Sequence, residues 1–175
     1  MTSTKQLRLG IAGLGRTGTR VAQYANAFEM NVLAWSENLI LETATQHGAR
    51  LVDKDSLFRD SDIVTIHYAL SDRSKGLVGS HEIGLMKPSS YLINTSRGAI
   101  VDEAALLAAL QERRIAGAAL DVFDQEPLPA DHPLLKLDNV VATPHLGFVT
   151  REQMGFYHAS IAQALADYLR SDQLK

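Results

Sequence analysis

The sequence predicts an α/β fold, with helices on both faces of one doubly wound, parallel β-sheet. Short apolar runs alternate with helix-like segments over nearly the whole of the 175 residues, which is typical of parallel sheets with helical crossovers. A turn with the spacing G-x-G-x-x-G, formed by Gly13, Gly15 and Gly18, separates the first apolar run from the first helix. These observations together indicate a fold of the Rossmann type.

The glycine-rich turn indicates a nucleotide-binding site, because each glycine has a physical role there. Gly13 allows a tight bend, Gly15 lets the backbone approach a pyrophosphate, and Gly18 lets the helix pack close to the strand. The helix N-terminus then offers free N–H groups and the positive end of its dipole to phosphates. The alternative is an ordinary glycine turn with no ligand.

The helix after the turn favours the nucleotide-binding alternative. Val21, Ala25 and Phe28 recur at positions i, i+4 and i+7, which predicts an apolar stripe that packs on the sheet. A strand, a glycine turn and an amphipathic helix in this order form the context that the motif requires.

The rest of the chain continues the alternation of strands and helices. Further strands are predicted at 32–35, 51–52, 62–70, 91–95, 116–122 and 139–142, and helices at about 41–47, 56–59, 80–86, 102–113 and from 150 onward. Asp102 can cap its helix, and Thr150 to Gln153 form a capping box. Apolar residues recur along one side of the final helix, at Met154, Ile161, Leu165 and Leu169.

The bulk properties exclude several classes of protein. A net charge of −3 gives no basic surface for nucleic acid, and no apolar run approaches the ~20 residues of a membrane span. The chain has no cysteine, which excludes disulfides and thiolate chemistry. The N-terminal residues contain no apolar signal segment. We expect a cytoplasmic protein of one domain, with no metal site and no nucleic-acid or membrane partner.

Ligands of such sheets bind beyond the carboxyl ends of the strands, so the residues that follow each strand are informative. An acid is expected after the second strand, where it binds the ribose hydroxyls. Ser36 occupies the expected position, and Glu37 follows it directly. No lysine or arginine lies between Val21 and Ala49 to neutralise a 2′-phosphate, which favours NAD over NADP. The alternative is that Ser36 and Glu37 form only a polar turn.

Two further strands end in polar residues. His67 and Tyr68 follow the centre of the 62–70 strand and would border the cofactor, although His67 could equally be a hydrogen-bonded core residue. Arg97 follows the 91–95 strand, where its planar guanidinium could bind a carboxylate. A surface salt bridge is the alternative for Arg97.

Glu126 and His145 follow the last two strands. Histidine is the usual general acid or base near neutral pH, and a neighbouring carboxylate would stabilise its protonated form. Taken singly, each of these residues is more often structural. Arg97, Glu126 and His145 together, each after a strand, indicate a catalytic site.

Five segments resemble the D-isomer-specific 2-hydroxyacid dehydrogenase family: GLGRTG (13–18), HYALSDRSKGLVG (67–79), INTSRGAIVDEAALLAAL (93–110), ALDVFDQEPLP (119–129) and TPHLGF (143–148). The resemblance covers almost the whole chain, but only the cofactor-binding domain of that family. We therefore expect residues 1–175 to form a dinucleotide-binding domain, with the family's substrate domain absent from this chain. Because the family typically pairs through this domain, the resemblance also implies a homodimer.

The resemblance implies roles for the catalytic residues. Arg97 would bind the carboxylate and carbonyl oxygen of a 2-oxo acid, His145 would donate a proton as hydride arrives, and Glu126 would pair with His145. Arg16 and Thr17 would lie at the pyrophosphate. The predicted cofactor-binding positions are Gly13, Gly15, Arg16, Thr17, Gly18, Ser36, Glu37, His67, Tyr68, Thr95, Ser96, Asp121 and Gly147.

The implied reaction is hydride transfer between NAD(H) and a small 2-hydroxy or 2-oxo acid. Glu126 argues against formate, because the related formate dehydrogenases have glutamine at this position. The sequence departs from the family at Ser36, where aspartate is usual, and at Ala69, where proline is usual. The alternative function is an NAD(H)-binding or sensing module without turnover.

Overall fold

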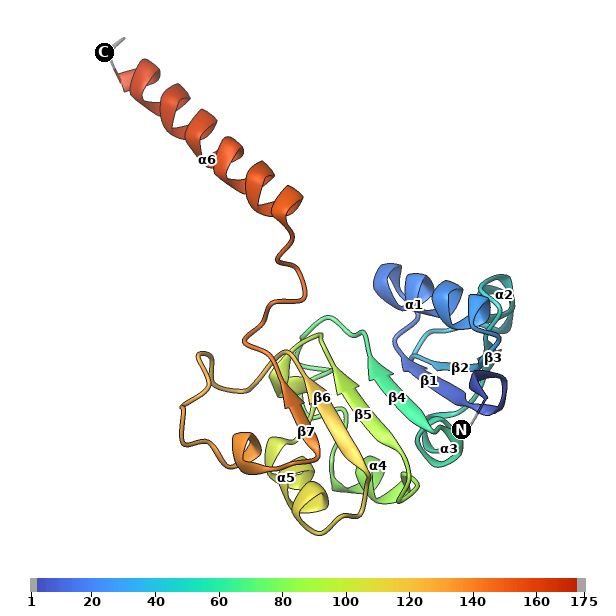
Figure 1. The fold of residues 1–175 in the computed structure, drawn as a ribbon. Helices are drawn as coiled ribbons and strands as arrows, with labels where there is room; N and C mark the ends of the chain where they lie inside the picture. Colours follow the sequence, from blue (N-terminus) through green and yellow to red (C-terminus); the bar gives the residue numbers. More distant parts are fainter. Residues whose placement is uncertain (1–2, 173–175) are drawn as a thin grey trace. The chain divides into compact units, whose positions relative to one another are not determined.

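The computed structural model describes residues 3–172, which fall into two compact units, residues 3–144 and 145–172. The first unit contains a seven-stranded, fully parallel sheet with the order β3-β2-β1-β4-β5-β6-β7 (Figure 1). The strand order reverses between β1 and β4, which makes this the switch point of the sheet. The predicted Rossmann-type fold is confirmed.

Strands and helices alternate as the sequence predicts. The strands are β1 (Arg8–Ala12), β2 (Asn31–Trp35), β3 (Arg50–Leu51), β4 (Ile63–Ile66), β5 (Tyr91–Asn94), β6 (Gly117–Leu120) and β7 (Val140–Ala142). The α-helices are α1 (Arg16–Ala27), α2 (Leu41–Gln46), α3 (Lys54–Asp60), α4 (Ser80–Leu85), α5 (Glu103–Gln111) and α6 (Arg151–Asp172). Short 3-10 turns occupy Thr4–Gln6, Gly98–Ile100 and Pro133–Lys136.

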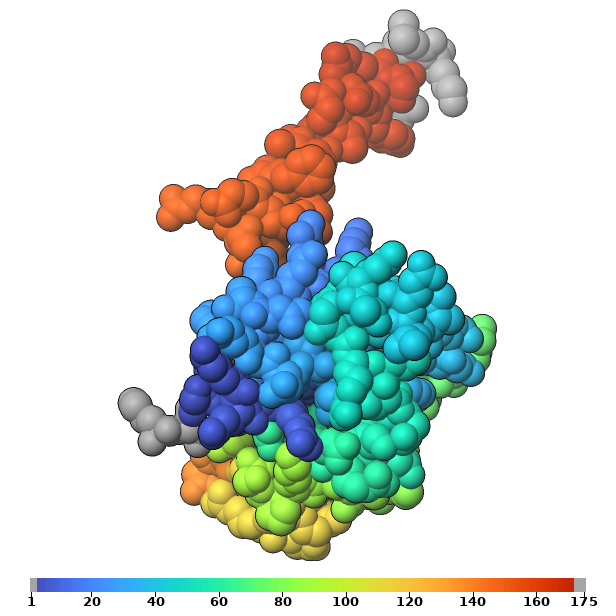
Figure 2. Space-filling model, turned by 90° about the vertical axis from the view of Figure 1, so that its right-hand side faces the viewer, coloured from blue at the N-terminus to red at the C-terminus, as the bar shows by residue number. Residues whose placement is uncertain are grey.

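Helices cover both faces of the sheet, and each face has its own buried cluster. Leu9 and Ile11 of β1 pack with small residues of α1 and α2 in one cluster. Ala12, at the end of the same strand, belongs to the larger cluster that α3, α4 and α5 build on the other face. The alternation of side chains along a strand separates the two clusters. Figure 2 views the molecule from the β3 side, where the segments that follow β1 and β2 form the surface.

The predicted stripe on α1 is confirmed at Ala25 and partly at Val21, but it is wrong at Phe28. The buried side of the helix consists of Gly18, Ala22 and Ala25, whereas the Phe28 side chain is 65% exposed and Val21 is half-buried. The reason is the closeness of the helix to the sheet, because a Cβ at Gly18 would collide with the Gly13 carbonyl oxygen. Only small side chains fit at that distance.

Several boundaries also differ from the prediction. The strand predicted at 62–70 ends at Ile66, because the chain leaves the sheet after the His67 N–H donates to the Ala12 carbonyl at 2.8 Å. The helix predicted at 56–59 begins earlier, since the Asp53 carboxylate caps it by accepting from the Ser56 N–H at 2.8 Å. The other shifts are of one or two residues, which is usual at the ends of elements. Asp102 caps α5 as predicted.

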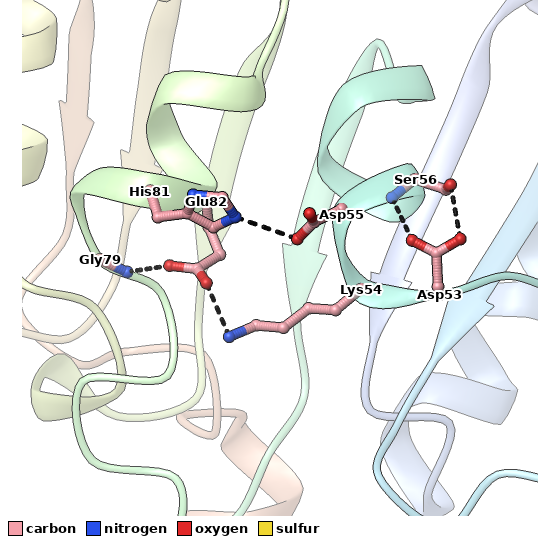
Figure 3. Close-up of polar contacts among 7 residues, drawn as sticks. All are labelled: Asp53, Lys54, Asp55, Ser56, Gly79, His81 and Glu82. Carbon is pink, nitrogen blue, oxygen red and sulfur yellow. Dashed lines mark hydrogen bonds and ion pairs between the residues drawn. The ribbon is translucent and has the colours of Figure 1, made fainter.

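A polar network joins α3 to α4 (Figure 3). The Glu82 carboxylate accepts from the Lys54 ammonium at 2.8 Å and from the Gly79 N–H at 2.8 Å. His81 contacts the Asp55 carboxylate at 3.1 Å. Burial alone would raise the pKa of Glu82, but the hydrogen bonds from Lys54 and Gly79 outweigh it and lower the pKa.

This network predicts a dependence of stability on pH. A carboxyl group with a lowered pKa stabilises the fold above its ordinary pKa, and this contribution is lost as the pH falls. We expect Glu82→Gln to lower the free energy of unfolding by about 1–3 kcal/mol at pH 7, and by less at pH 3.5. Urea unfolding at both pH values measures the difference. The exposed Glu42, changed to glutamine, is the control, and an equal loss at both pH values would contradict the role of the Glu82 charge.

The second unit contains the helix α6. The Thr150 hydroxyl accepts from the Gln153 N–H at 3.1 Å, which is the threonine half of the predicted capping box. Met154 is half-buried, whereas Ile161, Leu165 and Leu169 are each more than half exposed. Within residues 3–172, no helix is long and apolar enough to cross a membrane.

Candidate functional site

The loops at the carboxyl edge of the sheet are joined by a series of contacts. Tyr68, which follows β4, contacts the loops after three other strands. Its ring would meet a Cβ placed on Gly13, its hydroxyl accepts from the Glu37 N–H at 3.1 Å, and its carbonyl accepts from the Ser96 hydroxyl. The residues that follow β1, β2, β4 and β5 thus form one continuous surface at the switch point.

The glycine turn has the geometry of a phosphate-binding turn. Gly13 has a φ of +99°, and a Cβ there would lie 2.7 Å from the His67 carbonyl oxygen, so the bend requires glycine. At Gly15 a Cβ would meet no protein atom within 4 Å. Gly15 also offers no side chain to cap α1, so no N-cap side chain accepts from the first N–H groups of that helix. The residues fit a pyrophosphate, which such N–H groups and the helix dipole bind.

The end of β2 borders a cavity of about 430 Å³. Glu37 lies in its wall together with two cations, Lys54 and Arg73. Close to Glu37 in the sequence there is no cation, as the sequence analysis states. The fold, however, brings Lys54 and Arg73 to Glu37 from distant segments of the chain. Burial raises the pKa of Tyr68, also in this wall, and the Glu37 carboxylate adds to the rise.

His67 is half-buried and is hydrogen-bonded to a core residue. Its Nε2 lies 3.0 Å from the hydroxyl oxygen of Thr65, which is 5% exposed. Burial lowers the pKa of His67, so its ring is neutral near pH 7. This contact favours the alternative that His67 is a hydrogen-bonded core residue. A role of His67 at the cofactor stays a prediction.

Asn94 fixes the loop that carries Arg97. Its buried side chain donates to the Arg97 carbonyl at 2.9 Å and accepts from the Ser96 N–H at 3.1 Å. The Arg97 side chain is exposed and donates to the Ser96 carbonyl at 2.6 Å. Sequence reasoning missed the role of Asn94, although an asparagine at the end of a strand is a common signal for a turn.

The loop after β6 lies against the loop of Arg97. A Cβ at Gly98 would overlap the main chain of Phe123, so this glycine allows the two loops to touch. The Glu126 carboxylate accepts from the Phe123 N–H at 3.0 Å, which holds this predicted catalytic residue in the same loop. Asp121 is buried and accepts from the Thr143 hydroxyl at 2.5 Å.

His145 and Gly147 belong to the second unit. His145 has a φ of +54°, an uncommon conformation for a residue with a side chain, and strain of this kind often marks a functional position. Its ring packs edge-to-face on Phe148, with 5.8 Å between the ring centroids. Of the three predicted catalytic residues, Arg97 and Glu126 therefore lie in neighbouring loops of the first unit, and His145 belongs to the second unit.

A parallel sheet with an open glycine turn at its switch point defines a dinucleotide-binding protein. The family model described as "D-isomer specific 2-hydroxyacid dehydrogenase, NAD binding domain" matches residues 1–147. The chain therefore belongs to the family of D-isomer-specific 2-hydroxyacid dehydrogenases, and it matches the NAD-binding domain of that family.

Several relatives have names that report a reaction. The chain is 48% identical over 143 residues to a D-3-phosphoglycerate dehydrogenase of Archaeoglobus fulgidus, which covers 82% of this chain and 27% of the relative. It is 47% identical over 144 residues to a glyoxylate reductase of Aeropyrum pernix, with 82% and 43% covered. The crystal structure of a D-lactate dehydrogenase from Aquifex aeolicus, complexed with NAD and lactic acid, has a TM-score of 0.82 at 30% identity, with 98% and 56% covered.

The chain thus spans between about a quarter and somewhat more than half of the length of these relatives.

Proposed function

We propose that residues 1–175 form the NAD(H)-binding part of a dehydrogenase that transfers hydride between NAD(H) and a small 2-hydroxy or 2-oxo acid. The observation that carries the proposal is the glycine turn, with open space at Gly15 directly before the uncapped N-terminus of α1, in a chain of this family. NAD(H), when bound, supplies the hydride chemistry, and the protein orients the reactants.

Arg97 binds the carboxylate of the acid in this proposal. Its side chain is exposed after the carboxyl end of β5. Asn94 fixes the main chain of the loop at Ser96 and at Arg97. Among the described contacts its side chain uses one donor, toward the Ser96 carbonyl, and a guanidinium has five. The planar group can therefore form two parallel hydrogen bonds with a carboxylate.

In this proposal, His145 and Glu126 carry out the proton transfer. In reduction, His145 donates a proton to the carbonyl oxygen of the 2-oxo acid, and in oxidation it removes the proton from the hydroxyl group. A Glu126 carboxylate beside it stabilises the protonated histidine. The hydrogen bond from the Phe123 N–H supports this role, because it holds the carboxylate in place.

The test is NADH oxidation by a chain that carries residues 1–175 together with a substrate domain. Pyruvate, glyoxylate and hydroxypyruvate are supplied in turn, and the absorbance of NADH is followed. We expect turnover with at least one acid, and none by residues 1–175 alone, because positioning of the carbonyl contributes about 7–11 kcal/mol and needs a closed site. Turnover by neither protein would contradict the proposal.

We also propose a homodimer. The side of β5 and β7 that lies away from α4 and α5 is apolar and exposed within the described residues: Tyr91 is 49% and Val141 is 67% exposed. A contiguous exposed apolar surface often marks an interface between proteins. Light scattering is expected to give the mass of two chains, and a monomer at micromolar concentration would contradict this. The cytoplasmic location expected from the sequence stays a prediction.

A further inference from the structure

The cavity at the ends of β2 and β4 combines one anion with two cations. Its wall contains Glu37, Lys54 and Arg73, and it is about 430 Å³ in volume. The other lining residues are Trp35, Asn38, Tyr68, Ser71, Ser74 and Leu77. Because Glu37 directly follows the position that binds the ribose in this fold class, the cavity lies beside the adenosine end of a bound dinucleotide.

Tyr68 brings the two sides of this cavity together. Its hydroxyl accepts from the Glu37 N–H at 3.1 Å, and its ring lies 5.9 Å from the ring of Trp35. Trp35 and Glu37 belong to the end of β2, whereas Tyr68 begins the loop that leads to Arg73. The hydrogen bond therefore holds residue 37 against the loop that carries the arginine.

The two cations of the cavity differ in their partners. The Lys54 ammonium is paired with the Glu82 carboxylate at 2.8 Å and lies 5.6 Å from the centre of the Trp35 ring. The Arg73 side chain is exposed and, among residues 3–172, forms no ion pair or hydrogen bond. Arg73 is thus the cation with a charge still available to a ligand.

Hydrogen bonds hold the main chain around Arg73, so the point from which this side chain extends is fixed. The neighbouring Ser74 is 3% exposed. Its hydroxyl donates to the Ala69 carbonyl at 2.7 Å and accepts from the Ser71 N–H at 2.8 Å. These two bonds close the turn from which the arginine extends.

We propose that Arg73 is a specificity-determining residue: it gives this cavity an affinity for the 2′-phosphate of NADPH, and the Glu37 carboxylate cancels that affinity. The inference rests on the proposed NAD site. A 2′-phosphate carries about two negative charges, so Glu37 repels it and Arg73 attracts it, whereas the 2′-hydroxyl of NADH is neutral and responds weakly to both. The preference for NADH is then a balance between residues 37 and 73.

The test compares the dissociation constants of NADH and NADPH by titration calorimetry of the 175-residue chain. The parent is expected to bind NADH more tightly. Glu37→Gln is expected to tighten NADPH binding about tenfold relative to NADH binding, and to make NADPH binding weaker at high salt. Arg73→Ala in the Glu37→Gln background is expected to remove the gain. Lys75→Ala in the same background is the matched control, because Lys75 lies in the same turn but outside the cavity wall.

Three outcomes overturn the proposal and are distinguishable. If Glu37→Gln leaves NADPH binding unchanged while NADH still binds, Glu37 does not suppress the 2′-phosphate. If the gain survives Arg73→Ala, or is lost equally in Lys75→Ala, the specific role of Arg73 is wrong. If the parent binds neither nucleotide, the proposed function itself fails.

Discussion

Gly15→Val is expected to abolish NADH binding by the 175-residue chain. A Cβ at this position would meet no protein atom within 4 Å, so the open space belongs to whatever approaches the N-terminus of α1. A valine side chain would occupy the place of the pyrophosphate and block the N–H groups of the first helical turn. Titration calorimetry is expected to show saturable binding for the parent and none for the variant.

The same geometry predicts that Gly15→Val still folds. Gly15 has a φ of −84°, which residues with side chains adopt freely, and its surroundings are open. Its thermal midpoint is therefore expected to stay close to that of the parent. Gly84→Val is the control, since a Cβ at Gly84 also meets nothing within 4 Å but lies on α4. If the dissociation constant of NADH is unchanged in Gly15→Val, the pyrophosphate does not bind at this turn.

His145→Ala is expected to lower the rate of carbonyl reduction by roughly 10²–10⁴-fold in a chain that also carries a substrate domain. The loss follows from the missing general acid, because a methyl group cannot donate a proton to the carbonyl oxygen. Steady-state rates with NADH and the best 2-oxo acid measure it. His158→Ala is the control, as His158 is an exposed histidine on α6. A rate within a factor of about three of the parent would contradict the role of His145.

Glu126→Gln tests the partner of that histidine. The variant keeps the size of the side chain and an oxygen that can accept from the Phe123 N–H, but it has no charge. Without the carboxylate no charge stabilises the proton-donating histidine, so the rate of reduction at pH 7 is expected to fall well below that of the parent. A rate equal to that of the parent would contradict the pairing.

The fold could be predicted from the sequence because its signals are local. The glycine turn, the apolar runs and the cap at Asp102 each depend on residues close together in the chain, and the structure has each of them. The stripe on α1 was predicted correctly at Ala25 but wrongly at Phe28, because hydrophobicity favours Phe28, whereas the close approach to the sheet selects the small Ala22. Propensity carries no information about the distance between a helix and its sheet.

The charges of the candidate site could not be predicted, because distant segments supply them. Lys54 lies on α3 and Arg73 in the loop after β4, and both reach the cavity of Glu37 only once the sheet has formed. The role of Asn94 also depends on its burial, which places its amide between two main-chain groups. The residue type alone indicates only a turn.

We propose that a dinucleotide binds at the carboxyl edge of the sheet, with its pyrophosphate at the glycine turn. Chemical-shift mapping of the backbone amides of the 175-residue chain during an NADH titration locates the bound nucleotide. We predict that the largest shifts occur at Gly15, Arg16 and Thr17. A second cavity of about 600 Å³ lies at the amino ends of β1, β2 and β3, beside Arg8 and Arg50. Shifts confined to that cavity, with none at residues 13–18, would contradict the account.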